Sequence, residues 1–440
     1  MTNWDEAEQR VEKAHELYER GRWEEALSEL RAAIAINPYN GSWHFNLGLT
    51  YEMMERFEEA IAAYRHARDM DPDDIEVLNH LGVNCAMAGH LDESIKCFEK
   101  MEQLDASLEP AYCYRIFCHA EKGDHDKAEE LFYLARQYKE HCPVCYKHMG
   151  HSLMLRGQYD RALWCLQKAL QLEPGQPDVH SRIAEVYWAK NMLPEARQHF
   201  LEEIRSNPGD VDTLLDLGEL LVEMGQPAAA AEKFRQTLEL SPDEPVAHFR
   251  LGHLMLMDGN LPGALQEFRS TLRNDAHFPG AHLMMAIIYQ RQGQQSEALY
   301  HANCELAQSL ADEATLVDLG NLLMDLHQLT SAEQAYQRAL VLNPQNAVAR
   351  HSLAVTLFFA NRTEEGIEQC RLALRAQPKY VLAMYNLALA YMTKRDYIRA
   401  RYWLGEAISI SPEDPQLRQL QSRLKLVLFW NRLKRFIRVP

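Results

Sequence analysis

Residues 41–74 read GSWHFNLGLTYEMMERFEEAIAAYRHARDMDPDD, and this stretch decides the fold. It contains two runs whose apolar residues recur at three and four positions, which is the spacing of one face of an α-helix. The first run puts Gly48 and Tyr51 on one face, and the second run puts Ala60 and Tyr64 on one face. We therefore expect two helices packed back to back, with a small residue on each where the backbones come closest.

The same pattern recurs along the chain with a period of 34 residues, without insertion or deletion. Twelve copies start at residues 7, 41, 75, 109, 143, 177, 211, 245, 279, 313, 347 and 381. The position where the second helix crosses the first is small in every copy: Ala26, Ala60, Ser94, Ala128, Ala162, Ala196, Ala230, Ala264, Ala298, Ala332, Gly366 and Ala400. The matching position on the first helix is small except at Ile116. Repetition of this kind predicts a solenoid, in which each helix pair packs on its neighbours.

These positions resemble the tetratricopeptide repeat family, and the resemblance covers about residues 7–414. It implies an all-α, right-handed superhelix of about twelve helix-turn-helix units, preceded by a short lead-in over residues 1–6. Residues 415–440 leave the frame and carry an apolar stripe at helical spacing that includes Leu417, Leu420 and Leu424. This stripe predicts a capping helix over the open end of the last repeat.

Members of this family line the inner, concave wall of the superhelix with side chains of the first helices. Carried over by position, the resemblance implies a binding groove formed by Phe45, Asn46, Leu49, Met53, Asn321, His351, Phe358, Phe359, Tyr385, Asn386 and Met392. Aromatic and methionine side chains around a few amides suit an extended peptide or a helix. The alternative is that these side chains pack against the next repeat. For Phe358 and Phe359 the two readings stay open, because adjacent residues on one helix cannot both face the core.

Four repeats place a histidine early in the first helix: His44, His180, His248 and His282. Histidine at a half-buried position of a helix pair is typical of packing, and we predict that role here.

The segment EHCPVCYKHMGH, residues 140–151, carries the only concentration of metal-ligand residue types. Candidate zinc ligands are Cys142, Cys145, His148 and His151, with Cys113 expected across from them. Against this, a single cysteine pair is present, the spacing matches no usual zinc finger, and a helical solenoid needs no metal. We therefore predict neither a metal nor a cofactor.

The charge and cysteine content restrict the class of protein. The net charge of −17 argues against nucleic acid, which requires a basic face. The nine cysteines are odd in number, and the acidic start MTNWDEAEQR lacks the features of a signal peptide. We predict reduced thiols and a cytoplasmic protein, or one peripheral at the inner face of a membrane.

The last 26 residues, 415–440, carry seven cations and no acid, so that −17 less +7 leaves −24 for the rest of the chain. A second apolar stripe in this segment includes Phe429 and Trp430, but the run 426–430 is too short to cross a bilayer. Two interpretations stay open: a plain cap, or an amphipathic helix that binds an anionic membrane surface or a partner groove. The second interpretation rests on Arg423, Lys425, Phe429, Trp430, Arg432, Lys434, Arg435, Phe436 and Arg438.

The sequence contains no glycine-rich phosphate loop, no nucleophile elbow and no HExxH motif, and the repeats leave no residues for a catalytic domain. We therefore predict a non-enzymatic scaffold that binds a protein or peptide segment in its concave groove. The first alternative is a peripheral membrane assembly factor recruited through the basic tail. A second alternative is an accessory subunit that presents substrates to a separate enzyme.

Overall fold

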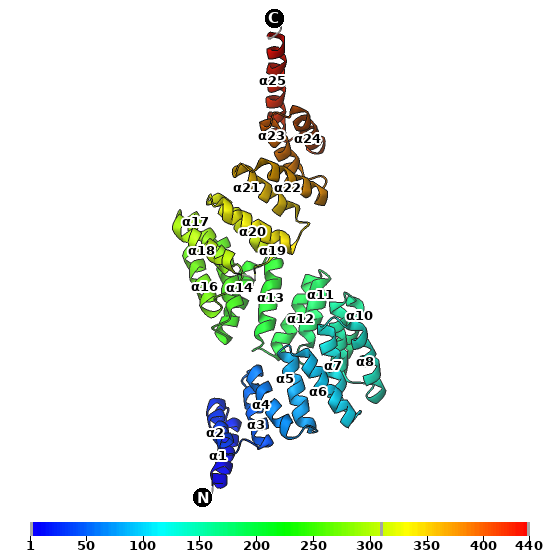
Figure 1. Ribbon diagram of the computed structural model, residues 1–440. Helices are drawn as coiled ribbons and strands as arrows, with labels where there is room; N and C mark the ends of the chain where they lie inside the picture. Colours follow the sequence, from blue (N-terminus) through cyan, green and yellow to red (C-terminus); the bar gives the residue numbers. More distant parts are fainter. Residues whose placement is uncertain (1–2, 309–310, 438–440) are drawn as a thin grey trace. The chain divides into compact units, whose positions relative to one another are not determined.

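The computed structural model describes residues 3–308 and 311–437, with side chains described from residue 4 to residue 430 outside that gap (Figure 1). Every regular element in these ranges is an α-helix. The first helices of the repeats are α1 (Asn3–Glu19), α3 (Gly41–Glu52), α5 (Ile75–Met87), α7 (Pro110–Glu121), α9 (Pro143–Leu155), α11 (Val179–Ala189), α13 (Val211–Glu223), α15 (Pro245–Met257), α17 (Ala281–Arg291), α19 (Glu313–Asp325), α21 (Ala347–Phe359) and α23 (Val381–Thr393). The second helices are α2 (Trp23–Ile36), α4 (Phe57–Met70), α6 (Leu91–Leu104), α8 (His125–Tyr138), α10 (Tyr159–Leu172), α12 (Leu193–Ser206), α14 (Pro227–Leu240), α16 (Leu261–Asn274), α18 (Gln295–Ala307), α20 (Leu329–Leu342), α22 (Thr363–Ala376) and α24 (Tyr397–Ile410).

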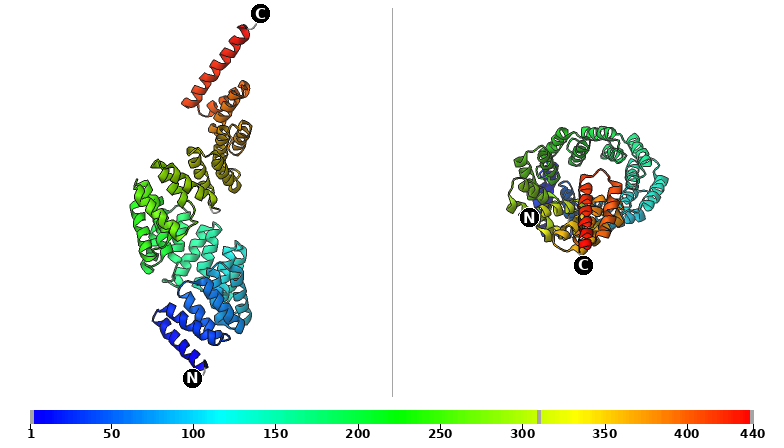
Figure 2. Two further views of the ribbon diagram at one scale, coloured as in Figure 1. Left: turned by 60° about the vertical axis from the view of Figure 1, so that its left-hand side comes forward. Right: turned by 90° about the horizontal axis from the view of Figure 1, so that it is seen from above.

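The chain forms two compact units, residues 1–226 and residues 227–440, and each is described here by itself. Within a unit, each first helix packs on the second helix of its own repeat, and that second helix packs on the first helix of the next repeat. Figure 2 shows this succession of helix pairs from two further directions. The predicted all-α solenoid of helix pairs is confirmed.

Close approach of the two helices explains the small residues of the repeat. Ala60 on α4 and Ala332 on α20 are completely buried at the crossing. On the first helices, a Cβ atom at Gly48 would lie 2.5 Å from the ring of Tyr64, and one at Gly320 would lie 2.5 Å from the ring of Tyr336. Glycine is required there because the aromatic ring of the second helix lies directly on the backbone of the first.

The turn between the two helices of each repeat contains one residue with positive φ. Glycine occupies this position in seven repeats, at residues 21, 89, 123, 157, 225, 259 and 293. Five repeats instead place a residue with a side chain in the left-handed region: Glu55, Asn191, His327, Asn361 and Arg395. A tight left-handed turn of this kind reverses the chain between two antiparallel helices.

The last helix, α25 (Pro415–Ile437), packs on α24 and covers the end of the C-terminal unit. Leu417, Leu420 and Leu424 are 1%, 2% and 3% exposed, respectively, and belong to the same core cluster as α23 and α24. The predicted capping helix is therefore present, and its first apolar stripe is the buried one.

Candidate binding groove

A hollow of about 390 Å³ lies between α21 and α23 in the C-terminal unit. Its walls come from α21, the turn that follows it, the start of α22 and the outer side of α23. It is lined by Val355, Phe358, Phe359, Asn361, Thr363, Asn386, Leu389, Ala390 and Thr393. Phe358, Phe359 and Asn386 are three of the residues that the sequence assigned to a groove.

The two adjacent phenylalanines have different roles. Phe358 packs on the helix crossing, because a Cβ atom at Gly366 would lie only 2.5 Å from its ring. Phe359 follows one position later on the helix and is 67% exposed. The first ring therefore forms the floor of the hollow, and the second projects from its edge as an exposed apolar contact.

The amide of Asn386 is held in place by a histidine of the preceding repeat. Its Nδ2 donates to Nε2 of His351 at 2.8 Å, and the edge of the His351 ring lies against Tyr380. Burial lowers the pKa of His351, which favours the neutral imidazole that can accept this hydrogen bond. Asn386 also lines the hollow, so its side-chain amide is within reach of a ligand there.

The remaining residues predicted for the C-terminal part of the groove do not line the hollow. Tyr385 and Met392 are half-buried and pack against the core of the last two repeats. Asn321 is exposed, and its side-chain oxygen accepts from the Tyr336 hydroxyl at 2.8 Å. For Tyr385 and Met392, packing against neighbouring repeats is the interpretation that agrees with their contacts.

A smaller hollow of about 150 Å³ lies between the first two repeats, and Asn46 and Leu49 line it. Phe45 does not, because its ring packs against Tyr64 and against His80 of the next repeat, with centroids 5.6 and 5.4 Å away. Met53 follows the end of α3 and is 48% exposed.

A third hollow, of about 420 Å³, lies on the second helices of repeats four and five, where no binding residue was predicted. Tyr133 on α8 and Trp164 on α10 border it, and both are more than half exposed. The sequence feature that could have indicated this hollow is a large aromatic residue at an outer position of two successive second helices. It was missed because the family resemblance places binding residues on the first helices.

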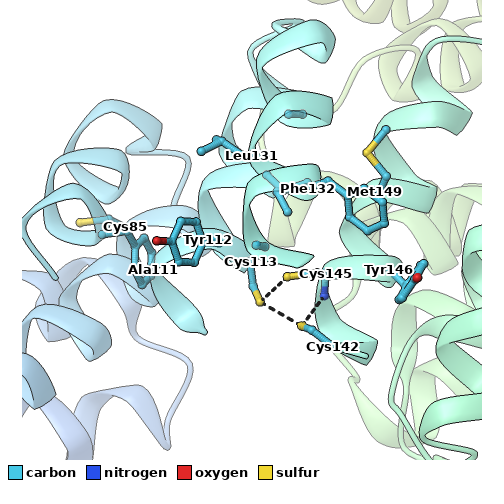
Figure 3. Close-up of a cluster of buried hydrophobic side chains, with 14 of the residues drawn as sticks. Cys85, Ala111, Tyr112, Cys113, Leu131, Phe132, Cys142, Cys145, Tyr146 and Met149 are labelled. Carbon is cyan, nitrogen blue, oxygen red and sulfur yellow. Dashed lines mark hydrogen bonds between the residues drawn. The ribbon is translucent and has the colours of Figure 1, made fainter. Parts of the chain in front are cut away.

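The metal-ligand candidates are brought together in a different combination from the predicted one. Cys142 caps the N-terminus of α9, Cys145 lies in its first turn, and Cys113 reaches them from α7 (Figure 3). Among the described residues, neither His148 nor His151 joins this cluster. The candidate set of two cysteines and two histidines is therefore not assembled, whereas Cys113, which was expected across from the candidates, lies with the two cysteines.

The two histidines lie in aromatic and ionic surroundings further along α9. His148 is buried against the rings of Tyr114 and Phe117, and burial lowers its pKa to about 3. His151 contacts Glu121 through Nε2 at 2.5 Å. Because α9 continues as a regular helix, His148 and His151 are carried one and two turns away from the thiols at its start.

Hydrogen bonds among the three thiols give the three cysteines different pKa values. Donation from Cys113 and Cys145 holds the pKa of Cys142 well below its usual range. The same contact with Cys142 raises the pKa of Cys113. Cys142 also accepts from the backbone N–H of Cys145 at 3.0 Å, a contact that favours its thiolate form.

The early histidines of the repeats make contacts within their own repeat. Nδ1 of His180 lies 3.0 Å from Nδ1 of His199, and Nδ1 of His282 lies 2.9 Å from Nδ1 of His301. These side chains link the first and second helices of a repeat, which agrees with the packing role predicted for them.

The described part of the second apolar stripe of α25 is exposed. Leu426, Phe429 and Trp430 are 59%, 59% and 52% exposed, and Arg423 and Lys425 also face solvent. No helix in the described ranges is both long enough and apolar enough to span a bilayer. The other predicted anchoring residues lie outside the described side chains: Arg432, Lys434, Arg435, Phe436 and Arg438.

Protein-family models of the tetratricopeptide repeat match most of the chain. Models of the tetratricopeptide repeat match residues 11–75, 215–279 and 381–414, and a TPR repeat model matches residues 150–191. The model of the Psidin N-terminal TPR repeats region matches residues 254–397.

Individual relatives share only part of their length with this chain. The TPR repeat-containing thioredoxin TTL4 of Arabidopsis thaliana is 28% identical over 116 residues, which are 26% of this chain and 17% of that protein. The peroxisomal targeting signal receptor of Kluyveromyces lactis is 30% identical over 99 residues, 22% of this chain and 18% of that protein. The crystal structure of yeast Tom70 is 12% identical, with a TM-score of 0.43, and the match covers 98% of this chain and 99% of that one.

The chain thus spans less than a fifth of the two curated relatives. The family models together match more than half of its residues, and the helix pairs follow the same repeat. This chain belongs to the tetratricopeptide repeat family.

Proposed function

We propose that the chain is a non-enzymatic scaffold that binds an extended segment of a partner protein in the hollow between α21 and α23. One observation carries this proposal: Phe359 is 67% exposed at the edge of an apolar hollow. A large apolar side chain left in water beside a concave surface favours burial by a partner. Membership of a repeat family that acts in protein–protein interaction supports the same conclusion.

The polar groups of the hollow favour an extended backbone as the ligand. Asn386 is fixed by His351 and lines the hollow, where its side-chain amide oxygen can accept from the N–H group of a peptide. An apolar side chain of the same peptide would contact Phe359 and Leu389, which line the same hollow. The acidic balance of residues 1–414 favours a neutral or basic segment over an acidic one.

Selection of a displayed peptide library on the full-length chain tests this proposal. We expect selected peptides to share one apolar anchor residue and to bind at micromolar affinity. Phe359→Ala should weaken their binding about 10-fold to 30-fold, because it removes an exposed aromatic contact. Asn386→Ala should weaken it about fivefold, the effect of one hydrogen bond lost at an interface.

Tyr402 on α24 provides the matched control, since it is an aromatic residue of the same unit and is 58% exposed. Tyr402→Ala should leave the affinity unchanged. Peptides that bind wild type, Phe359→Ala and Asn386→Ala equally well would contradict a site between α21 and α23. Circular dichroism of each variant establishes that helicity is retained.

We propose as a second candidate function that α25 recruits the array to an anionic membrane surface. The observation in favour is that Leu426, Phe429 and Trp430 are exposed on a helix that also exposes Arg423 and Lys425. Exposed apolar side chains beside cations are the composition of helices that lie in a membrane interface.

Sedimentation with liposomes distinguishes this candidate from a plain cap. We expect the full chain to bind vesicles rich in phosphatidylserine, and to bind them more weakly at high salt. Phe429→Ser combined with Trp430→Ser should abolish binding, whereas Tyr402→Ser should not. Binding that is equal on neutral and anionic vesicles, or absent from both, would contradict membrane recruitment by this helix.

A further inference from the structure

Three cysteine thiols from two successive repeats converge at the start of α9. Sγ of Cys113 lies 2.9 Å from Sγ of Cys145 and 3.4 Å from Sγ of Cys142 (Figure 3). All three sulfur atoms lie within 4.8 Å of one another. Cys113, Cys142 and Cys145 are 2%, 2% and 1% exposed, so the cluster is closed to bulk water.

The arrangement fits a shared metal ion better than a disulfide. A disulfide joins two sulfur atoms at about 2.05 Å and leaves the third thiol without a role. Thiolates that share a tetrahedral zinc ion at about 2.3 Å lie about 3.8 Å apart.

The local backbone also suits a metal-binding thiolate. Cys142 and Cys145 have the C-x-x-C spacing found in structural zinc sites. The backbone N–H of Cys145 donates to Sγ of Cys142 at 3.0 Å, and α9 begins at Pro143 with its positive dipole end toward this sulfur.

A carboxylate and a cation complete the surroundings of the cluster. Glu109, at the N-terminus of α7, interacts electrostatically with Cys142. The ammonium group of Lys139 forms an ion pair with Glu109. Three thiolates and a dication carry a net charge of −1, and the carboxylate of Glu109 beside them is offset by Lys139, which lowers the cost of burial.

We propose that Cys113, Cys142 and Cys145 bind a zinc ion, with the carboxylate of Glu109 beside the site as a supporting group. The ion joins α7 to the start of α9 and so fixes the fourth repeat against the fifth. Binding releases the thiol protons to solvent, and no atom changes its oxidation state. Hard cations such as Mg²⁺ prefer oxygen ligands and are not expected here.

The fourth repeat departs from the repeat pattern at two positions. Ile116 stands where the other first helices have glycine or alanine, and Glu140 stands where most repeats have the loop proline. A metal link at this junction would compensate for the departure, because the stability of a solenoid depends on each nearest-neighbour interface.

Metal analysis of the full-length chain, purified with a reductant and without chelator, tests the proposal. We expect one zinc ion per chain by elemental mass spectrometry. Replacement of zinc by Co²⁺ should give the visible absorption of a tetrahedral, sulfur-rich site, together with thiolate-to-metal charge transfer. The cobalt spectrum requires no mutation, so it tests the ligand set even where a variant fails to fold.

Variants identify the ligands. Cys113→Ser and Cys145→Ser should each lose the metal, whereas Cys165→Ser should retain it, since Cys165 is a buried cysteine of α10 outside the cluster. Glu109→Gln should weaken zinc affinity about tenfold or more. An unchanged affinity would show that Glu109 does not support the site.

Three results would overturn the proposal. The first is a chain without zinc that also fails to bind Co²⁺ while all nine thiols titrate as free. The second is a loss of two thiols to a disulfide under non-reducing purification, with no metal bound. The third is stoichiometric copper in place of zinc, which would assign the site to a different ion.

Discussion

The side chain of Phe358 packs at the helix crossing of the eleventh repeat, and its direction determines that the next side chain is exposed. Its ring occupies the space over Gly366, so that even an alanine at this crossing would be too large. Successive residues on a helix are separated by about 100°. The inward position of Phe358 therefore turns Phe359 outward, where it is 67% exposed.

Backbone strain at one turn residue yields a prediction about stability. His327 is exposed between α19 and α20 and has a φ of 59°, a conformation in which a Cβ atom is unfavourable. His327→Gly should raise the opening free energy of α19 and α20 by about 0.5–1 kcal/mol, as measured by native-state hydrogen exchange.

His327→Ala is the matched control, because it removes the imidazole and keeps the Cβ atom. We expect no gain from it. An equal gain from alanine and glycine would show that the imidazole, rather than the left-handed backbone, was the unfavourable feature.

At the scale of the helix, the pair α17 and α18 is joined through two neutral imidazoles, His282 and His301, whose Nδ1 atoms are 2.9 Å apart. Burial, then the neighbouring His282 and Arg269, lowers the pKa of His301 to about 4. Burial also lowers the pKa of His282. The flat face of Tyr289 stacks on His301 and keeps that ring from water.

These shifts predict loss of stability in acid. An unfolded histidine takes up a proton at about pH 6.5, whereas folded His301 does so only near pH 4. The contribution of this pair is therefore complete above about pH 6.5 and is lost progressively as the pH falls toward 4. His301→Gln should reduce the loss of unfolding free energy between pH 7.5 and pH 5 by about 1 kcal/mol, measured by urea denaturation.

His277 lies at the end of the preceding repeat and is exposed, so His277→Gln is the control that changes a histidine without changing the pair. The same pH dependence in wild type and His301→Gln would contradict a role for the buried pair.

The helices could be predicted because every repeat carries the same local sequence pattern. Apolar spacing marks each helix face, and a small residue such as Ala332 marks each crossing. The contents of the sites were less predictable, because they depend on side-chain directions between repeats. Phe45 and Tyr385 occupy positions like those of groove residues, yet they contact neighbouring repeats. Cys113 was expected across from the candidate ligands, but its grouping with the two cysteines and without the histidines depends on how α7 contacts α9.

At the scale of the whole chain, binding surface and stability come from different parts of one repeated unit. The crossings and turns are nearly alike from repeat to repeat, and the hollows differ because a few positions of the first helices vary. Phe359, Asn386 and Leu389 come together only where the eleventh and twelfth repeats meet. A scaffold built in this way acquires a specific site by substitution at one junction, while the rest of the array keeps its packing.

Photo-crosslinking of a selected peptide to the full-length chain tests the central claim most directly. The photoreactive residue benzoylphenylalanine would replace Phe359 in one protein and Tyr402 in another, and mass spectrometry would identify the crosslinked sites. The account predicts crosslinks to the peptide from position 359 that disappear when unlabelled peptide is added, and none from position 402. Crosslinks of equal strength from both positions, or from position 402 alone, would contradict a binding site between α21 and α23.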